Sequence, residues 1–262
     1  MAALSGHVAI VTGGGRGLGR AVAERLASLG AAVVIASRNA PELDEVAKGI
    51  KRTGGRALAQ TADVADERQV QELVLATERW VGPATILVNN AGTVDPLTPL
   101  ARSDATLWLR SLAINIGGTY LATRAVLPGM LDRGYGRIVM ITSGAAIRPS
   151  AGWTAYAAGK AAVLHMTRSL ALELEATGVT ACAFNPGHMD TETQEQIRRT
   201  STADFPRSDE FRAAHRERKL SDPRVPARAV AYLALPSTER NGEALEWSDE
   251  ALRGAVEAAV PA

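Results

Sequence analysis

Cysteine is almost absent from this chain of 262 residues. Cys182 is the only one, so an intrachain disulfide cannot form and a four-cysteine zinc site is excluded. Long hydrophobic runs are also lacking, because no window approaches the roughly 18 uninterrupted apolar residues of a membrane span, and the N-terminal stretch lacks the features of a signal peptide. The sequence therefore predicts a cytoplasmic protein with no membrane partner and no metal site.

An excess of one charge is lacking as well. The 29 Lys and Arg residues against 28 Asp and Glu give a formal net charge of +1. Nucleic-acid surfaces usually need clustered basic residues, so we expect a small-molecule partner and no nucleic acid. No linker, repeat or low-complexity tract divides the chain, and its hydrophobic content of 46% is sufficient for a sizeable core. We expect one domain over residues 1–262.

Short apolar runs alternate with longer segments of helical spacing. The runs cover residues 7–11, 31–37, 57–64, 85–90, 136–143 and 179–186. Nearly continuous apolar strands separated by helices are typical of a parallel sheet covered on both faces. The prediction is an α/β fold with a doubly wound parallel sheet, a Rossmann fold in a single domain. Residues 155–177 should form one long helix ending before Gly178, and a further strand is plausible near residues 244–247.

A glycine-rich segment, TGGGRGLGR, follows the first apolar run at residues 12–20. In a doubly wound fold this position brings backbone amides and a helix N-terminus to a phosphate, and a side chain there would block the approach. A nucleoside-triphosphate loop would continue with Lys and Ser or Thr after Gly19, whereas Arg20 and Ala21 follow. The remaining interpretations are a dinucleotide loop or a merely tight strand–helix turn.

Two side chains suited to proton transfer lie four residues apart on the long predicted helix. Tyr156 and Lys160 therefore project from one face and can reach the same ligand. The Lys160 ammonium should lower the pKa of the Tyr156 phenol from its usual value near 10. Ser143, at the end of the fifth apolar run, is placed to donate to a substrate carbonyl oxygen that Tyr156 protonates, while a nicotinamide supplies hydride. The alternatives are an exposed helix face and a capping serine.

The spacing T-G-x-x-x-G-x-G resembles that of the short-chain dehydrogenase/reductase family. Further family motifs follow in order over about residues 5–191: NNAG at 89–92, Asn115, Ser143, Tyr156 with Lys160, and NPGHMDT at 185–191. The resemblance implies a catalytic tetrad of Ser143, Tyr156, Lys160 and Asn115. It also implies that Lys160 holds the nicotinamide ribose and that Asn115 supports a proton-relaying water. Gly159 departs from the common Ser and should weaken the helix by about 1 kcal/mol.

The cofactor is predicted from the end of the second apolar run. An NAD site needs a carboxylate about 20 residues beyond the glycine loop, but that position holds Ser37 and Arg38, and the next acid is Glu42. Arg38 and Arg16 could bind a 2′-phosphate, which favours NADP over NAD, unless both are solvated surface residues. The expected cofactor contacts are Gly13, Gly15, Arg16, Gly17, Leu18, Gly19, Ser37, Arg38, Asp63, Val64, Asn89, Ala91, Gly92, Tyr156, Lys160, Pro186, Gly187, Met189 and Thr191.

The substrate should lie beyond the carboxyl ends of the strands. Candidate lining residues are Val94, Ala145, Arg148, Trp153 and His188, and Arg148 either binds an acidic substrate or is solvated. Residues 188–226, rich in charge and proline, suggest a substrate-binding lid of one or two short helices with Phe205 and Phe211 facing inward. A solvated surface excursion is the alternative.

Taken together, the motifs predict an NADP-dependent oxidoreductase acting on a carbonyl or alcohol substrate, with Tyr156 as its acid and base. A dinucleotide-binding sensor or scaffold without turnover is the alternative, although such a protein has no need of Tyr156 or Ser143. A nucleotide-sugar epimerase fits less well because the chain is short. The C-terminal residues depart from the family pattern, but apolar helix faces around Asn115 and Tyr156 favour a homodimer or homotetramer.

Overall fold

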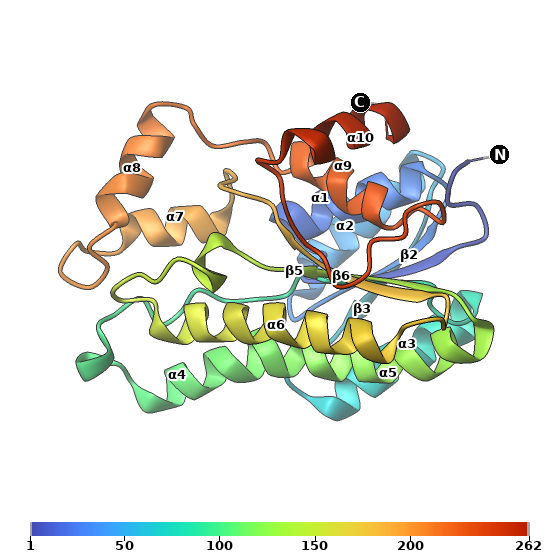
Figure 1. Ribbon diagram of the computed structural model, residues 1–262, viewed down its shortest axis with the longest axis horizontal. Helices are drawn as coiled ribbons and strands as arrows, with labels where there is room; N and C mark the ends of the chain where they lie inside the picture. Colours follow the sequence, from blue (N-terminus) through green and yellow to red (C-terminus); the bar gives the residue numbers. More distant parts are fainter. Residues whose placement is uncertain (1, 261–262) are drawn as a thin grey trace.

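A parallel sheet of seven strands forms the centre of the computed structural model, which describes residues 2–260 (Figure 1). Its order is β3-β2-β1-β4-β5-β6-β7, and every pair of neighbours is parallel. The strands are β1 Val8–Thr12, β2 Ala32–Ser37, β3 Arg56–Thr61, β4 Ile86–Asn89, β5 Gly136–Ile141, β6 Val179–Asn185 and β7 Ala244–Glu246.

Ten α-helices connect or follow these strands. They are α1 Gly17–Ser28, α2 Ala40–Arg52, α3 Glu67–Val81, α4 Ala105–Leu112, α5 Gly118–Arg133, α6 Thr154–Glu173, α7 Glu192–Arg199, α8 Ser208–Arg216, α9 Arg224–Leu233 and α10 Glu250–Ala259. A π-helical turn, Ala113–Gly117, joins α4 to α5. Several of these helices begin at a side-chain cap, as at Asn39 before α2 and Asp66 before α3.

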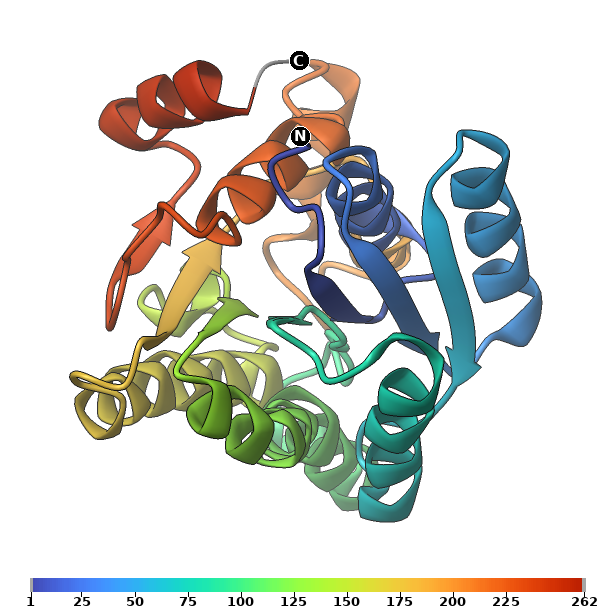
Figure 2. The same ribbon diagram turned by 90° about the vertical axis from the view of Figure 1, so that its right-hand side faces the viewer.

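Side chains from alternate strand positions enter two separate cores. Val11, Ile35 and Phe184 pack under α1, α2, α9 and α10, whereas Ile10 and Val34 pack against α3, α5 and α6. Figure 2 shows the sheet lying between these two groups of helices. Because both faces are covered, every residue of the central strands β1, β4 and β5 is buried. This arrangement confirms the predicted doubly wound fold and single domain.

The strand boundaries agree closely with those predicted from the sequence, whereas the end of the long helix does not. Each predicted run overlaps a strand, although β1 ends one residue beyond its run and β3 begins one residue before its run, and β7 lies within the predicted residues 244–247. The predicted helix over 155–177 was too long at its end, because α6 stops at Glu173. Thr177 donates through its hydroxyl to the Leu174 carbonyl at 2.7 Å, and Ala176 adopts a positive φ of 60°. This turn ends the helix ahead of Gly178.

Residues 188–226 contain α7 and α8, which project beyond the sheet in Figure 1. The base of the segment is closed by backbone bonds, since Asp190 N–H donates to the Ser221 carbonyl and Ser221 N–H to the His188 carbonyl, both at 3.0 Å. Phe205 and Phe211 are almost fully buried and form a third apolar cluster with Trp153. The segment therefore packs on the rest of the chain through an aromatic core of its own.

Phe184→Ala should destabilise the protein strongly, because Phe184 is fully buried in β6 beneath the helices of one face. Truncating a buried Phe costs about 3–5 kcal/mol through lost burial and the remaining cavity. Leu75→Ala on α3 is the control, since Leu75 is 48% exposed. Urea unfolding followed by circular dichroism measures both. Equal free energies of unfolding for the two variants would contradict this description of the core.

Candidate active site

The carboxyl ends of the central strands open into one cavity of about 750 Å³. The chain continues from β1 to β2 on one side, whereas β4 lies on the other side of β1. The connecting segments therefore diverge at this point and leave a crevice beyond the strand ends. The cavity receives the segments that follow β1, β2, β4, β5 and β6, together with the first turn of α7.

The glycine loop is fastened to the end of β4 by side-chain hydrogen bonds. The Asn90 amide donates to the carbonyls of Thr12 and Gly13 at 3.0 and 3.1 Å, and the Thr12 hydroxyl accepts from Asn90 N–H at 3.0 Å. Gly13 has a positive φ of 66°, and a Cβ at Gly19 would lie 2.1 Å from the Gly13 carbonyl oxygen. The close approach of α1 to the loop thus requires glycine.

The N-terminus of α1 faces the cavity with no capping side chain. Arg16 occupies the N-cap position and makes no capping hydrogen bond, so the first amides of α1 remain available to an acceptor in the cavity. Gly17, which also lines the cavity, has a φ of 51°. Uncapped amides at the positive end of a helix dipole are suited to phosphate. The loop therefore fits the pyrophosphate of a dinucleotide.

The end of β2 carries opposite charges at one end of the cavity. Arg16 and Arg38 are both exposed and line it. The Glu42 carboxylate also lies there, 3.1 Å from the position of a Cβ on Gly15, and the Ser37 hydroxyl is 3.4 Å from that position. The sequence reading noted Glu42 only as the next acid along the chain. The first turn of α2 instead places its carboxylate in the cavity.

Asp63 and Val64 line the same end of the cavity, after β3. Asp63 pairs with Arg110 of α4 and accepts through its carboxylate from Ala65 N–H at 3.0 Å. Val64 packs against Gly118, where a Cβ would lie 2.6 Å from a Val64 methyl group. These contacts hold the loop after β3 against α4 and α5.

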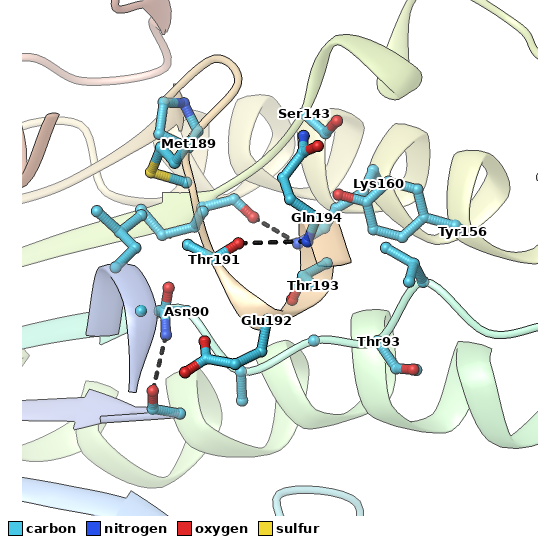
Figure 3. Close-up of a pocket in the computed structure, with 18 of the residues that line it drawn as sticks. Asn90, Thr93, Ser143, Tyr156, Lys160, Met189, Thr191, Glu192, Thr193 and Gln194 are labelled. Atoms are coloured by element: carbon cyan, nitrogen blue, oxygen red, sulfur yellow. Dashed lines mark hydrogen bonds between the residues drawn. The ribbon is translucent and has the colours of Figure 1, made fainter. Parts of the chain in front are cut away.

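Lys160 joins the long helix to the end of β5. Its ammonium donates to the Ile141 carbonyl at 2.7 Å and lies 5.8 Å from the centre of the Tyr156 ring. The Ser143 hydroxyl, two residues beyond β5, accepts from Ala145 N–H at 3.2 Å, and this bond leaves its proton free to be donated. Figure 3 shows Ser143, Tyr156 and Lys160 gathered at one side of the cavity, with the first turn of α7 beside them.

Burial determines the protonation of both helix residues. It raises the pKa of the Tyr156 phenol, and a hydrogen bond with Ser143 opposes the rise. It also lowers the pKa of Lys160 from 10.5 to about 8. The expectation that Lys160 lowers the pKa of Tyr156 was therefore wrong for the chain alone. The ammonium faces the Ile141 carbonyl, and its charge does not outweigh the desolvation of the phenol.

Asn115 lies fully buried in the π-helical turn, directly behind the cavity. Its side-chain oxygen accepts from Thr93 N–H at 3.1 Å, and its amide donates to the Thr93 carbonyl at 2.8 Å. A Cβ on Gly92 would lie 2.8 Å from the Asn115 side-chain oxygen, and one on Gly159 would lie 3.0 Å from Asn115 Cβ. Gly159 therefore allows close packing at Asn115, a role that the sequence reading missed.

The predicted substrate residues lie beyond the catalytic group, against the segment with α7 and α8. Val94, Ala145 and Trp153 are buried and belong to the aromatic cluster around Phe205 and Phe211. The Trp153 ring lies 4.9 Å from the Tyr156 ring and 5.9 Å from that of Phe211. His188 stacks on Phe211 with ring centres 5.2 Å apart. All five predicted substrate residues line the cavity, including Arg148.

Almost all of the predicted cofactor residues also line the cavity, with two exceptions. The Asn89 side chain points away to α5, where its amide donates to the Thr123 hydroxyl at 2.9 Å. Successive residues of a strand point to opposite faces of the sheet, so Asn90, and not Asn89, lies beside the glycine loop. Gly19 packs inside the loop. The lining residues that the sequence reading missed include Asn39, Glu42, Asn90, Thr93, Glu192, Gln194, Ile197 and Arg207, whereas Phe211, predicted to face inward from the lid, also lines the cavity.

Several of these missed residues come from the first turn of α7 and the start of α8. Their local sequence contains no motif that predicts this position. They reach the cavity only because the α7–α8 segment packs on Trp153, which is distant in the sequence. Within residues 2–260, no group of His, Cys, Asp or Glu has the arrangement of a metal site. No helix in that range has the length and apolar character needed to cross a membrane.

Comparison with known proteins gives consistent matches. The model of the short chain dehydrogenase family matches residues 7–202. A short chain dehydrogenase of Pseudocercospora fijiensis is 41% identical over 191 residues, which cover 72% of this chain and 62% of the relative. The match thus spans about three fifths of that relative's length.

Solved structures are similar over nearly the whole chain. Levodione reductase superposes with a TM-score of 0.85 at 28% identity and covers 96% of this chain and 99% of its own. An actinorhodin polyketide ketoreductase with NADPH has a TM-score of 0.83 at 32% identity, and the match covers 92% of this chain and 95% of the ketoreductase. The cavity and its Ser143, Tyr156 and Lys160 group are thus found on a fold shared with reductases. The chain belongs to the short chain dehydrogenase family, whose members are NAD(P)-dependent oxidoreductases.

Proposed function

We propose that this protein is an NADP-dependent oxidoreductase that transfers hydride between the nicotinamide and a carbonyl or alcohol substrate. The observation that carries the proposal is the hydrogen-bonded pair of Ser143 and Tyr156 beside the buried Lys160 ammonium. A sensor or scaffold would need the glycine loop but not this group. We therefore favour the enzyme over a binding-only member of the same fold.

In this proposal, Tyr156 donates its proton to the substrate oxygen during reduction and takes it back during oxidation. The nicotinamide supplies or accepts the hydride. Ser143 donates a hydrogen bond to the same oxygen, because Ala145 N–H already occupies an acceptor position of its hydroxyl. The raised pKa keeps the Tyr156 phenol protonated at neutral pH, which suits an acid in the direction of reduction. Asn115 holds the Thr93 loop beside Lys160 and supports a proton-relaying water.

The dinucleotide would lie along the cavity from the end of β2 to Tyr156. The amides at the start of α1 would hold the pyrophosphate, and Lys160 would hold the hydroxyls of the nicotinamide ribose. Asp63 and Val64 would contact the adenine ring, while Pro186, Gly187, Met189 and Thr191, which line the cavity after β6, would contact the nicotinamide end.

NADP is favoured by the charges at the end of β2. Arg16 and Arg38 line the cavity, and their guanidinium groups have no hydrogen-bond or ion-pair partner among residues 2–260. The Glu42 carboxylate opposes a 2′-phosphate, so the two guanidinium groups must outweigh it. The related ketoreductase structure contains NADPH, which supports the same assignment.

The proposed activity is tested with purified protein, NADPH and a panel of ketones, aldehydes, β-ketoacyl thioesters, quinones and keto sugars, followed by the absorbance of the reduced nicotinamide. The reverse panel pairs NADP with alcohols. We expect turnover of at least one compound. Tight NADPH binding with no turnover of any class would instead support the sensor.

Tyr156→Phe should abolish turnover and leave cofactor binding nearly unchanged, because it removes the transferable proton and little else. The loss of general acid–base catalysis is expected to be about 10²–10⁴-fold in kcat. Tyr120→Phe is the matched control, since Tyr120 lies half-exposed on α5. If Tyr156→Phe keeps a tenth of the wild-type rate, Tyr156 is not the acid.

Cofactor affinity should fall as the pH rises through about 8, the pKa of Lys160. Below that value the side chain carries its charge and, besides the N–H that donates to Ile141, two donors for the ribose, and above it the charge is lost. We expect the NADPH dissociation constant to rise several-fold between about pH 7 and about pH 9. Lys160→Ala should bind weakly at both values. If the NADPH dissociation constants of the wild type and of Lys160→Ala change with pH by the same factor, the role of Lys160 would be refuted.

Wild-type protein should prefer NADPH over NADH by about 10- to 10³-fold in kcat/KM, if Arg16 and Arg38 bind the 2′-phosphate. Ser37→Asp with Arg38→Leu should reverse the preference, because the new carboxylate accepts from the NAD ribose and repels the phosphate. Arg52→Leu, at the exposed far end of α2, is the control. A double variant that still prefers NADPH would show that Arg38 plays no part.

We also propose that the protein assembles as a homodimer or homotetramer in the cytoplasm, with no nucleic-acid or membrane partner. Large apolar side chains remain exposed on α5 and α6, including Tyr120 at 50% and Leu172 at 70% exposure. Burying them against a second copy would remove apolar surface from water. Light scattering that gives a monomer mass at micromolar concentration would rule out this assembly.

A further inference from the structure

We infer that the substrate carries an anionic group, such as a carboxylate, separated from its reacting carbonyl by an apolar body about the size of one ring. The inference rests on the proposed function, because it takes Tyr156 as the position of the carbonyl. It is based on two guanidinium groups, Arg148 and Arg207, that both line the cavity and both act on His188. The sequence reading considered Arg148 alone.

The two arginines come from different parts of the chain. Arg148 follows β5, and its guanidinium lies against Gly144, where a Cβ would be 2.7 Å from a terminal nitrogen. Arg207 directly precedes α8, and its guanidinium donates to the Ser150 hydroxyl at 2.8 Å. Both charges act on the ring of His188, whose pKa is lowered by burial and then by Arg207 and Arg148. The positive groups thus converge at the edge of the pocket.

Little negative charge opposes them at this end. Arg207 pairs with Glu210 through its Nε at 2.8 Å, but the Glu210 side chain is 63% exposed. The Arg148 guanidinium has no hydrogen-bond or ion-pair partner among residues 2–260. The acids that line the cavity lie at its other end. The Glu42 and Glu192 carboxylates lie 3.1 and 3.8 Å from the positions of a Cβ on Gly15 and Gly17 of the glycine loop, and Asp63 pairs with Arg110. An incoming anion would therefore meet an unpaired guanidinium at Arg148 and a second one at Arg207, whose charge Glu210 compensates in part.

Aromatic rings form a continuous path from Tyr156 to Arg207. The Tyr156 ring contacts Trp153, Trp153 contacts Phe211, and the Arg207 guanidinium lies 5.7 Å above the Phe211 ring. Val94 and Ile197 complete this apolar wall. A substrate whose carbonyl oxygen reaches Tyr156 would thus place an apolar body on Trp153 and Phe211 and an anion at Arg207 and Arg148.

The test compares 4-acetylbenzoate with 4-acetylbenzamide, which has nearly the same shape and no charge. We expect kcat/KM to be about 10- to 100-fold higher for the carboxylate at low salt, as for a charge-assisted hydrogen bond in a partly desolvated site. The preference should shrink as salt is added, because ions screen the guanidinium groups. Equal use of the two ketones would overturn the inference.

Variants identify the groups responsible. Arg148→Gln and Arg207→Gln should each reduce the ratio of carboxylate to amide kcat/KM by about tenfold. Arg199→Gln should leave the ratio unchanged, because Arg199 also lies in the α7–α8 segment and pairs with Glu195 but does not line this cavity. Arg207→Lys keeps the charge and should retain part of the preference. A ratio unchanged in both glutamine variants would contradict the site.

A binding measurement separates this inference from the proposed enzyme activity. Calorimetry on the NADP-loaded protein should show benzoate binding at least about tenfold more tightly than benzamide, with the difference lost in Arg148→Gln. Benzoate selectivity without turnover of any ketone would reject the proposed reaction and keep the anion site. Turnover of both ketones without benzoate selectivity would reject the anion site and keep the reaction.

Discussion

The hydrogen bond from the buried Lys160 ammonium to the Ile141 carbonyl links the helix and the strand that carry the proposed catalytic group. It fixes α6, which carries Tyr156, to the end of β5, just ahead of Ser143. The same burial lowers the pKa of Lys160 to about 8 and raises that of Tyr156. The place where α6 meets β5 therefore positions the side chains proposed for catalysis, and burial there shifts the pKa of both Tyr156 and Lys160.

Close backbone packing makes this contact possible. Gly92 and Gly159 bring the loop after β4 and the long helix against Asn115, whose amide and oxygen both bond to Thr93. Asn90 fastens the glycine loop to the same strand end. The glycine loop and the group of Ser143, Tyr156 and Lys160 are thus attached to the neighbouring central strands β4 and β5. The substrate end, by contrast, is closed by the separate aromatic packing of α7 and α8.

Sequence reading predicted the parts of the site that depend on local spacing. The four-residue interval of Tyr156 and Lys160 and the glycines after β1 define chemistry within a helix or a turn, so they could be predicted without tertiary structure. Arg207 and Glu42 could not, because their positions depend on how α8 and α2 pack against distant loops. The pKa shift of Tyr156 was expected in the wrong direction because the sequence reveals a neighbouring charge but not the cost of burying the phenol.

Isotope transfer tests the central claim, that Ser143, Tyr156 and Lys160 serve hydride transfer to a carbonyl, most directly. The protein is incubated with a ketone and NADPH that carries deuterium at the transferred position of the nicotinamide, and the alcohol is examined by mass spectrometry and NMR. The account predicts one deuterium on the carbinol carbon. An alcohol formed without deuterium on that carbon, or firmly bound NADPH that reduces no carbonyl compound, would contradict it.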